Sequence, residues 1–386
     1  MFVRHLLKTN PQLVELALTW EREGIILPDT YLIDLDAVCS NAYRMLDSAR
    51  RSEITLYFML KQLGRNPLVA RKLFELGFPG AVCVDFHDAQ VMIEAGIHIG
   101  NVGHLVQVPR NAIARVVAAR PDVITIYSVA KAHEIGDEAL RQGLVQPIML
   151  RVIGPNDVLY SGQYGGFVLD ELENTVHELE GIPGVRIAGV CSFPCVLYSE
   201  DAKDFVATHN TSTVIRAADL LESMGYKDLQ LNMPSASCTR TIPLVASLGG
   251  THMEPGHGLT GTTPYHAVHD DAEESVAYVY VSEVSHCYGG KAFCYAGGHY
   301  RRGHMSNAIV GWNLEDAHLM QVTPPTAESI DYYFELAERC DVGTPVVMCY
   351  RTQMFTTRSE VAVVSGLSAG KPQLEGIFDA QGRPIR

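Results

Sequence analysis

The sequence predicts an α/β fold: a (β/α)8 TIM barrel followed by a second, smaller and mostly β C-terminal domain. From residue 54 to about 258, eight short apolar segments alternate with longer segments of helical periodicity. After about residue 262 the pattern changes to β-rich blocks separated by Gly-rich turns. Alternating apolar strands and helices indicate a parallel sheet covered by helices, and eight such units fit a closed barrel. A doubly wound open sheet is the alternative.

The predicted barrel strands are short and apolar. They cover residues 54–60, 81–86, 99–106, 123–128, 147–152, 186–193, 229–234 and 250–256. Helical periodicity is visible in residues 66–78 and in residues 199–225, where we expect Gly225 to end the helix as a C-cap. An earlier apolar segment, residues 31–36, stands apart from the eight.

Three regions are expected along the chain: an N-terminal helical extension (1–30), the barrel (31–262) and the β-rich domain (263–386). Residues 1–24 indicate an amphipathic helix rather than a signal peptide, because a small-residue cleavage site is missing and Glu15 and Glu21 interrupt the apolar face. A membrane span needs about 18 consecutive apolar residues, and the sequence has no such stretch. We therefore expect a cytoplasmic protein.

The composition excludes some classes of partner. The net charge of −14 argues against nucleic acid, which needs a basic surface, but not against a small anion bound at a local site. The nine cysteines include no C-x-x-C pair, and an odd number in a chain of 386 residues fits a reducing compartment. Cys191 and Cys195 lack His or Cys partners at usable spacing, so no zinc site is predicted.

A lysine ends the first predicted barrel strand, in the segment "YFMLKQLG". In such barrels the chemistry lies at the carboxyl ends of the strands. Lys61 has apolar neighbours there, and desolvation favours its neutral amine, which can form a Schiff base with an aldehyde cofactor. The alternative is a solvated lysine where the strand reaches the surface.

Two segments indicate a phosphate site. Ser235 and Ser237 follow the seventh strand, just before a helical segment, where short hydroxyls and backbone N–H groups bind phosphate. A simple N-cap is the alternative interpretation. In "MEPGHGLTG", after the eighth strand, Gly256 permits close backbone approach, so the amides of Gly256 and His257 can face a phosphate.

A carboxylate and an aromatic ring complete the set. Glu254 is expected to point into the barrel mouth, with an ordinary strand-end carboxylate as the alternative. Phe193 presents a flat ring after the sixth strand, with core packing as the alternative. Pyridoxal 5′-phosphate (PLP) needs an imine-forming lysine, a phosphate cradle, a carboxylate and an aromatic face. A barrel that binds phosphate without a cofactor needs only the cradle.

Four segments resemble motifs of one enzyme family. "YLIDLDAVCSNAYRML" is similar to the family's "DLDAL…N" pattern, and "YFMLKQLG" falls where the family has "VVKANAYG". "MEPGHGL" matches "VRPGIALYG" and, better, "EPGR", while "CYAGGHYRRG" resembles "GYADGYPR". On these motifs the chain resembles the fold-type III PLP enzymes, which include alanine racemase and the eukaryotic ornithine and diaminopimelate decarboxylases. Within this family it is most similar to the YhfX-like branch.

The resemblance implies roles for individual residues. Those implied to hold the cofactor are Lys61 as the Schiff-base residue, Phe193 against the pyridine ring, and Ser237, Ser235, Gly256 and His257 at the phosphate. Tyr295 falls at the position of the racemases' second catalytic base. In the family this tyrosine reaches into the other subunit's site, so the resemblance also implies a homodimer.

Two departures from the family pattern change the expected chemistry. Arg65 replaces the family's tyrosine four residues after the lysine, and Glu254 stands where alanine racemase has an arginine on the pyridine nitrogen. A glutamate favours the protonated nitrogen, which makes the ring a stronger electron sink. Broad racemisation, decarboxylation and lyase chemistry therefore all become plausible. Arg151 can orient the cofactor or bind a carboxylate, or it can form an ion pair with Glu254 inside the barrel.

The sequence thus predicts a PLP-dependent amino acid racemase or epimerase, with Lys61 and Tyr295 as the two bases. A decarboxylase or lyase on the same scaffold is one alternative, with Cys349 as a candidate acid, although buried packing also explains that cysteine. A non-catalytic PLP-binding protein is another. The His-rich stretches lack suitable partners for a metal site; they are His252/His257, His266/His269 and His299/His304.

Overall fold

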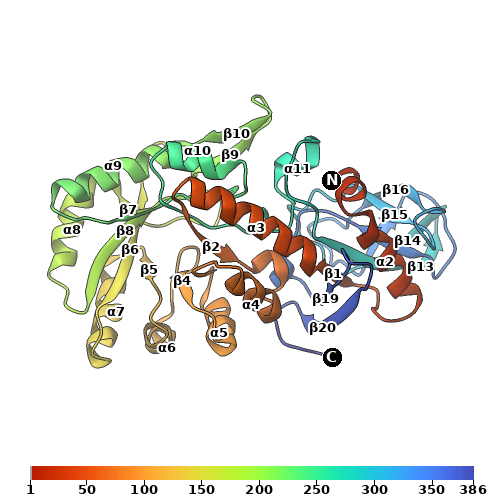
Figure 1. Ribbon diagram of the computed structural model, residues 1–386, viewed down its shortest axis with the longest axis horizontal. Helices are drawn as coiled ribbons and strands as arrows, with labels where there is room; N and C mark the ends of the chain where they lie inside the picture. Colours follow the sequence, from red (N-terminus) through yellow and green to blue (C-terminus); the bar gives the residue numbers. More distant parts are fainter. Residues whose placement is uncertain (1) are drawn as a thin grey trace. The chain divides into compact units, whose positions relative to one another are not determined.

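The computed structural model describes residues 2–386, which divide into two compact units (Figure 1). One unit, called the β unit below, comprises the chain up to Ala42, Lys61–Val69 and His257–Arg386. The other, called the barrel unit, comprises Tyr43–Leu60 and Ala70–Gly256. Of the residues predicted to form the site, Lys61 and His257 belong to the β unit and Glu254 belongs to the barrel unit.

Eight parallel strands close the barrel unit. Around the barrel, each strand pairs with the next in the order β2, β3, β4, β5, β6, β8, β11, β12, and β12 pairs with β2 again. The strands are β2 (Thr55–Met59), β3 (Gly80–Cys83), β4 (Ile99–Val102), β5 (Val123–Ile126), β6 (Gln146–Ile153), β8 (Val185–Cys191), β11 (Gln230–Asn232) and β12 (His252–Met253). The predicted barrel is confirmed, and the pairing of β5 with β6 rules out an open sheet.

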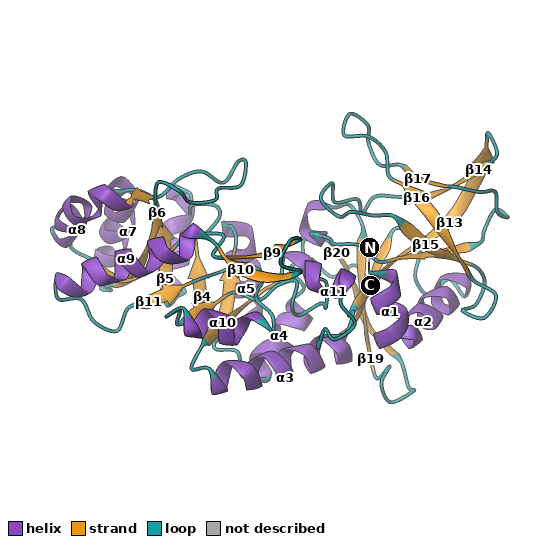
Figure 2. Ribbon diagram, turned by 90° about the horizontal axis from the view of Figure 1, so that it is seen from above, coloured by secondary structure: helices purple, strands orange, loops and turns teal. Residues whose placement is uncertain are grey.

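Helices connect most of these strands and flank them (Figure 2). They are α3 (Leu35–Arg51), α4 (Pro67–Glu75), α5 (Phe86–Ala95), α6 (Ile113–Ala118), α7 (Val129–Arg141), α8 (Leu172–Glu180), α9 (His209–Ser223) and α10 (Thr241–Ser247). Local signals fix their ends: the Asp85 side chain accepts from the backbone N–H of Asp88 to start α5, and Gly96 ends it with φ 71°.

One predicted helix is shorter than the sequence pattern indicates. Residues 199–225 were expected to be helical, but a hairpin of β9 (Val196–Ser199) and β10 (Asp204–Ala207) precedes α9. The hairpin forms because apolar residues pair across it, with the rings of Tyr198 and Phe205 in edge contact at 5.8 Å. The predicted end is confirmed, since Gly225 follows the helix in the left-handed region with φ 97°.

The β unit is built on a second sheet, mostly antiparallel, of nine strands in the order β14-β17-β16-β15-β18-β13-β1-β19-β20. The strands are β1 (Thr30–Asp34), β13 (Tyr278–Tyr288), β14 (Lys291–Tyr295), β15 (Asn307–Val310), β16 (His318–Thr323), β17 (Tyr333–Leu336), β18 (Pro345–Met348), β19 (Glu360–Ser365) and β20 (Gln373–Asp379). Strand β1 is the apolar segment that stood apart from the barrel strands. It is buried between β13 and β19.

The N-terminal segment forms two helices instead of the single helix expected. Helix α1 (Val3–Thr9) stops at Asn10, and α2 (Pro11–Arg22) starts with a proline that has no N–H to donate. The side chain of Asn10 accepts from the N–H of Leu13 at 3.3 Å and donates to Asp34 at 2.8 Å. Both helices pack in the core of the β unit. Within residues 2–386 no helix is long and apolar enough to cross a membrane.

A carboxyl pair, with Glu21 buried and Glu283 half-buried, joins α2 to the sheet of the β unit. Glu21 is only 7% exposed and shares a hydrogen bond with Glu283 on β13. Burial, together with the neighbouring Glu283 carboxyl, raises the pKa of Glu21 to about 8. The proton on Glu21 is therefore part of the packing between helix and sheet near neutral pH.

This arrangement predicts a stability that falls as pH rises. The folded-state pKa of Glu21 lies above its ordinary value of 4.5. The protonated carboxyl therefore stabilises the fold fully below pH 4.5, and this stabilisation is lost as the pH rises toward 8. Between pH 4.5 and about 8, we expect the free energy of unfolding of Glu21→Gln to rise relative to that of the wild type, by at most about 1.4 kcal/mol per pH unit. Urea unfolding at several pH values measures this, with the exposed Glu23→Gln as control. A constant difference between variant and wild type would contradict the assignment.

Candidate active site

A buried carboxylate lies at the centre of the barrel unit. Glu254 directly follows β12 and is 4% exposed. One of its oxygens, Oε1, accepts from Nδ2 of Asn101 at 2.8 Å and from Nδ2 of Asn232 at 2.7 Å. The hydroxyl of Thr125 donates to Oδ1 of Asn101 at 2.7 Å, which fixes the orientation of that amide. Side chains from β4, β5 and β11 thus hold Glu254, and amide donors of this kind stabilise a carboxylate.

Aromatic rings lie beside this carboxylate. Nε2 of His104 is 4.0 Å from Oε2 of Glu254, and the ring of His104 meets Phe193 edge-on with centroids 5.5 Å apart. Tyr160 contacts Phe193 in a similar way, also at 5.5 Å. Phe193 is half-buried, so its ring is not simply part of the core. Sequence reasoning missed His104, although a polar residue at the end of an apolar strand segment is a usable signal.

Arg151 is buried in the barrel but is not the ion-pair partner of Glu254. Its guanidinium donates to the hydroxyl of Tyr127 at 2.6 Å and to the carbonyl of Gln163 at 2.8 Å, and it lies 5.0 Å from the Tyr127 ring. Among residues 2–386 these are its hydrogen bonds, so the alternative of an ion pair with Glu254 is wrong, while a role toward a cofactor or a carboxylate stays a prediction. Arg151 instead connects the loop after β6, through the carbonyl of Gln163, to the barrel.

The segment after β11 has the features of an anion site. Ser237 is 4% exposed, and within residues 2–386 its buried hydroxyl has no hydrogen-bond partner. Ser235 and the next residue have φ values of 110° and 49°, in the left-handed region that costs free energy without glycine. The N-cap alternative is wrong, because α10 starts only at Thr241 and no side chain caps it. A buried hydroxyl of this kind can donate to a phosphate oxygen.

The β unit holds a second group of predicted residues. Lys61 begins a short 3-10 helix, η1 (Lys61–Leu63), and is half-buried. Nε of Arg351 donates to Nε2 of His257 at 3.0 Å, and Nδ1 of His257 lies 3.2 Å from the hydroxyl of Thr262. Because an arginine can only donate, Nε2 of His257 must be unprotonated. Burial lowers the pKa of His257 well below 6.5, and the charges of Arg351 and Lys61 lower it further.

His257 therefore provides a neutral imidazole within the electrostatic reach of Lys61. Sequence reasoning used only its backbone amide and gave Arg351 no role. No sequence signal marks Arg351, because the sheet of the β unit brings it to His257 from 94 residues away.

The remaining residues that the sequence analysis singled out have different surroundings. Tyr295 ends β14 with a side chain that is 38% exposed, and no described residue of this chain hydrogen-bonds its hydroxyl. Cys349 is buried among apolar side chains, and burial raises the pKa of its thiol to about 12, which agrees with packing rather than proton transfer. Arg65 lies over the ring of Phe355 at 4.9 Å. Among residues 2–386, no cluster of three His, Cys, Asp or Glu side chains is suited to a metal ion.

The chain is similar to known families over most of its length. It matches the model of the alanine racemase N-terminal domain over residues 33–264 and that of the YhfX-like C-terminal domain over residues 279–374. The chain therefore belongs to the alanine racemase N-terminal domain family, whose members typically use PLP. It is 41% identical to "Uncharacterized protein YhfX" of Escherichia coli over 387 residues, which covers 100% of both chains.

Solved structures share the fold at low sequence identity. D-threonine aldolase from Filomicrobium marinum is 16% identical with a TM-score of 0.69, covering 93% of this chain and 96% of that one. D-threo-3-hydroxyaspartate dehydratase from a Delftia species is 16% identical with a TM-score of 0.67, covering 93% and 97%. Alanine racemase of Clostridium difficile, in complex with cycloserine, is 15% identical with a TM-score of 0.63, covering 92% and 99%. Different reactions thus occur on this fold.

The network around Glu254 predicts a measurable coupling. Asn101→Ala leaves a buried carboxylate with one donor fewer, so we expect it to lower the free energy of unfolding by about 1–3 kcal/mol. In the double variant Asn101→Ala/Glu254→Gln the cost should be smaller, because the charge is gone. Urea denaturation of the four proteins in this cycle measures the coupling. The exposed Asn111→Ala is the control, and an additive cycle would contradict the interaction.

Proposed function

We propose that the protein is a PLP-dependent enzyme that moves the α-proton of an amino acid, with racemisation or epimerisation as its reaction. The observation that carries the proposal is the buried Glu254 carboxylate held by two amides in a barrel of this family. A carboxylate rather than an arginine at this position suits a protonated pyridine ring. The buried hydroxyl of Ser237 and the half-buried ring of Phe193 also fit the cofactor.

Each residue has a distinct part in this proposal. When bound, PLP withdraws electrons from the α-carbon of an amino acid joined to its aldehyde carbon. Glu254 would pair with the ring nitrogen, Phe193 would cover the ring, and Ser237 would donate to the phosphate, as would the amides of Gly256 and His257.

Proton transfer is assigned to Lys61 on one face of the α-carbon. Its amine would hold the cofactor and then accept or return the α-proton. Tyr295 would serve the opposite face. Since the Tyr295 hydroxyl is exposed and has no partner among the described residues of its own chain, we propose that it acts in a homodimer.

A second candidate is cleavage or elimination of a β-hydroxy amino acid. The Glu254 carboxylate supports it as much as racemisation, because a protonated pyridine ring is a strong electron sink that suits cleavage as well. The names of the aldolase and the dehydratase describe reactions of this class in those proteins.

The cofactor assignment predicts a visible absorbance that depends on one lysine. Wild-type protein supplied with PLP should show an absorbance band that borohydride removes, and Lys61→Ala should lose it. Lys72→Ala, an exposed lysine of α4 paired with Glu75, should keep the band. A band that persists in Lys61→Ala would reject this lysine, and its absence from the wild type would reject a PLP enzyme altogether.

The choice between the two reactions predicts different effects of Tyr295→Phe. For a racemase, solvent deuterium should enter the α-carbon of both L- and D-amino acids, and Tyr295→Phe should slow exchange from one enantiomer by about 10²–10⁴-fold. Tyr333→Phe, a neighbouring half-exposed tyrosine, should leave both rates unchanged. NMR of a panel of amino acids in deuterated water measures this. Release of an aldehyde or keto acid, with exchange insensitive to Tyr295→Phe, would favour the lyase.

A further inference from the structure

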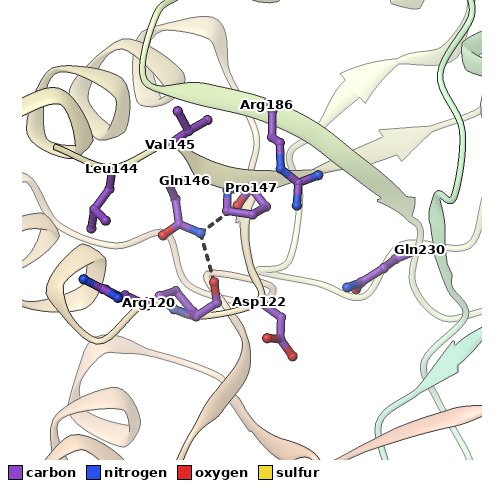
Figure 3. A pocket seen from close by; sticks show the side chains of 9 residues that line it. Arg120, Asp122, Leu144, Val145, Gln146, Pro147, Arg186 and Gln230 are labelled. Atoms are coloured by element: carbon purple, nitrogen blue, oxygen red, sulfur yellow. Dashed lines mark hydrogen bonds between the residues drawn. The ribbon is translucent and has the colours of Figure 1, made fainter.

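A cavity opens at the amino-terminal ends of the barrel strands, opposite the strand ends that carry Glu254. Its volume is about 400 Å³, within the range of small-molecule sites. It is lined by Arg120, Pro121, Asp122, Leu144, Val145, Gln146, Pro147, Arg186 and Gln230 (Figure 3). These residues precede or begin β5, β6, β8 and β11. The proposed PLP chemistry uses none of them.

Opposite charges face this cavity without neutralising each other. Arg186, Asp122 and Gln230 line this cavity from three parts of the barrel; in Figure 3 Arg186 and Gln230 extend into it, and Asp122 lies below them with its carboxylate turned away from Arg186. Within residues 2–386, the guanidinium of Arg186 has no hydrogen-bond or ion-pair partner. Oε1 of Gln230 is likewise buried without a donor among these residues. An arginine and a carboxylate that line one cavity but do not pair leave room for a ligand between them.

Hydrogen bonds to neighbouring side chains hold the carboxylate of Asp122 in place. Oδ1 of Asp122 is 2.7 Å from Nε2 of His98, and Oδ2 accepts from the hydroxyl of Tyr57 at 3.0 Å. Nε2 of Gln230 lies 3.4 Å from the same hydroxyl. Burial and the Asp122 charge raise the pKa of Tyr57, so this hydroxyl stays a donor. Each carboxylate oxygen keeps a lone pair for a further donor.

We propose that this cavity is a binding site for a free amino acid, held as its zwitterion. The carboxylate of the ligand binds the guanidinium of Arg186, which presents paired donors of matching geometry. Its ammonium group binds the carboxylate of Asp122. A simple anion would be repelled by Asp122 and a simple cation by Arg186, so a ligand with both charges is complementary to the cavity.

L-Proline is the probe that tests this site. It carries both charges, and its secondary amine cannot form the neutral imine that a primary amino acid forms with an aldehyde. Calorimetric titration of the purified full chain should show saturable binding. Arg186→Gln should weaken it at least tenfold, and Asp122→Asn should weaken it too. Arg71→Gln, an exposed arginine of α4 outside the cavity, should bind like the wild type.

Two results would overturn the proposal. One is the absence of saturable binding to the wild type. The other is an affinity for proline that is the same in Arg186→Gln as in the wild type. Arg186 is exposed, so its replacement tests the site even where Asp122→Asn disturbs the hydrogen bonds to His98 and Tyr57.

Discussion

The pair of amide hydrogen bonds to Glu254 is the interaction on which the centre of the barrel depends. A carboxylate with almost no exposure needs donors, and Asn101 and Asn232 supply them from β4 and β11. Both amides reach the same oxygen only because β12 lies in a closed barrel, where strands distant in sequence surround one axis. Closure of the sheet thus determines how a charged group can be kept at its centre.

A similar constraint acts on the imidazole of the β unit. His257 is neutral because burial and the Arg351 guanidinium both oppose its protonation. The Arg351 donor also fixes which ring nitrogen carries the proton. The ring therefore keeps one tautomer, with Nδ1 directed to Thr262. The chain thus contains a buried carboxylate held by amide donors in the barrel unit and a neutral imidazole with both ring nitrogens in hydrogen-bond contact in the β unit.

Much of the fold could be predicted because apolar strands and helical periodicity are local properties. The predicted barrel strands all correspond to observed strands, and β1, which was not counted among the eight but lay within the expected barrel region 31–262, belongs to the sheet of the β unit. The errors occur where a local sequence pattern is compatible with two secondary structures. Residues 196–207 form a hairpin because cross-strand packing outweighs helical periodicity there. Likewise, the N-terminal helix divides at Asn10 because the amide of that residue bonds to Asp34.

The sequence by itself determined the fold class, the family and the residue types at the strand ends, among them Lys61, Ser237 and Glu254. These follow from short segments whose spacing is fixed by the chain. Only the tertiary structure decided which side chains meet. Arg151 bonds to Tyr127 and Gln163 rather than to Glu254, and Arg351 reaches His257 from the loop that follows β18. The reason is physical: hydrogen bonds act over a few ångströms, and the chain brings distant residues that close only after the sheets have formed.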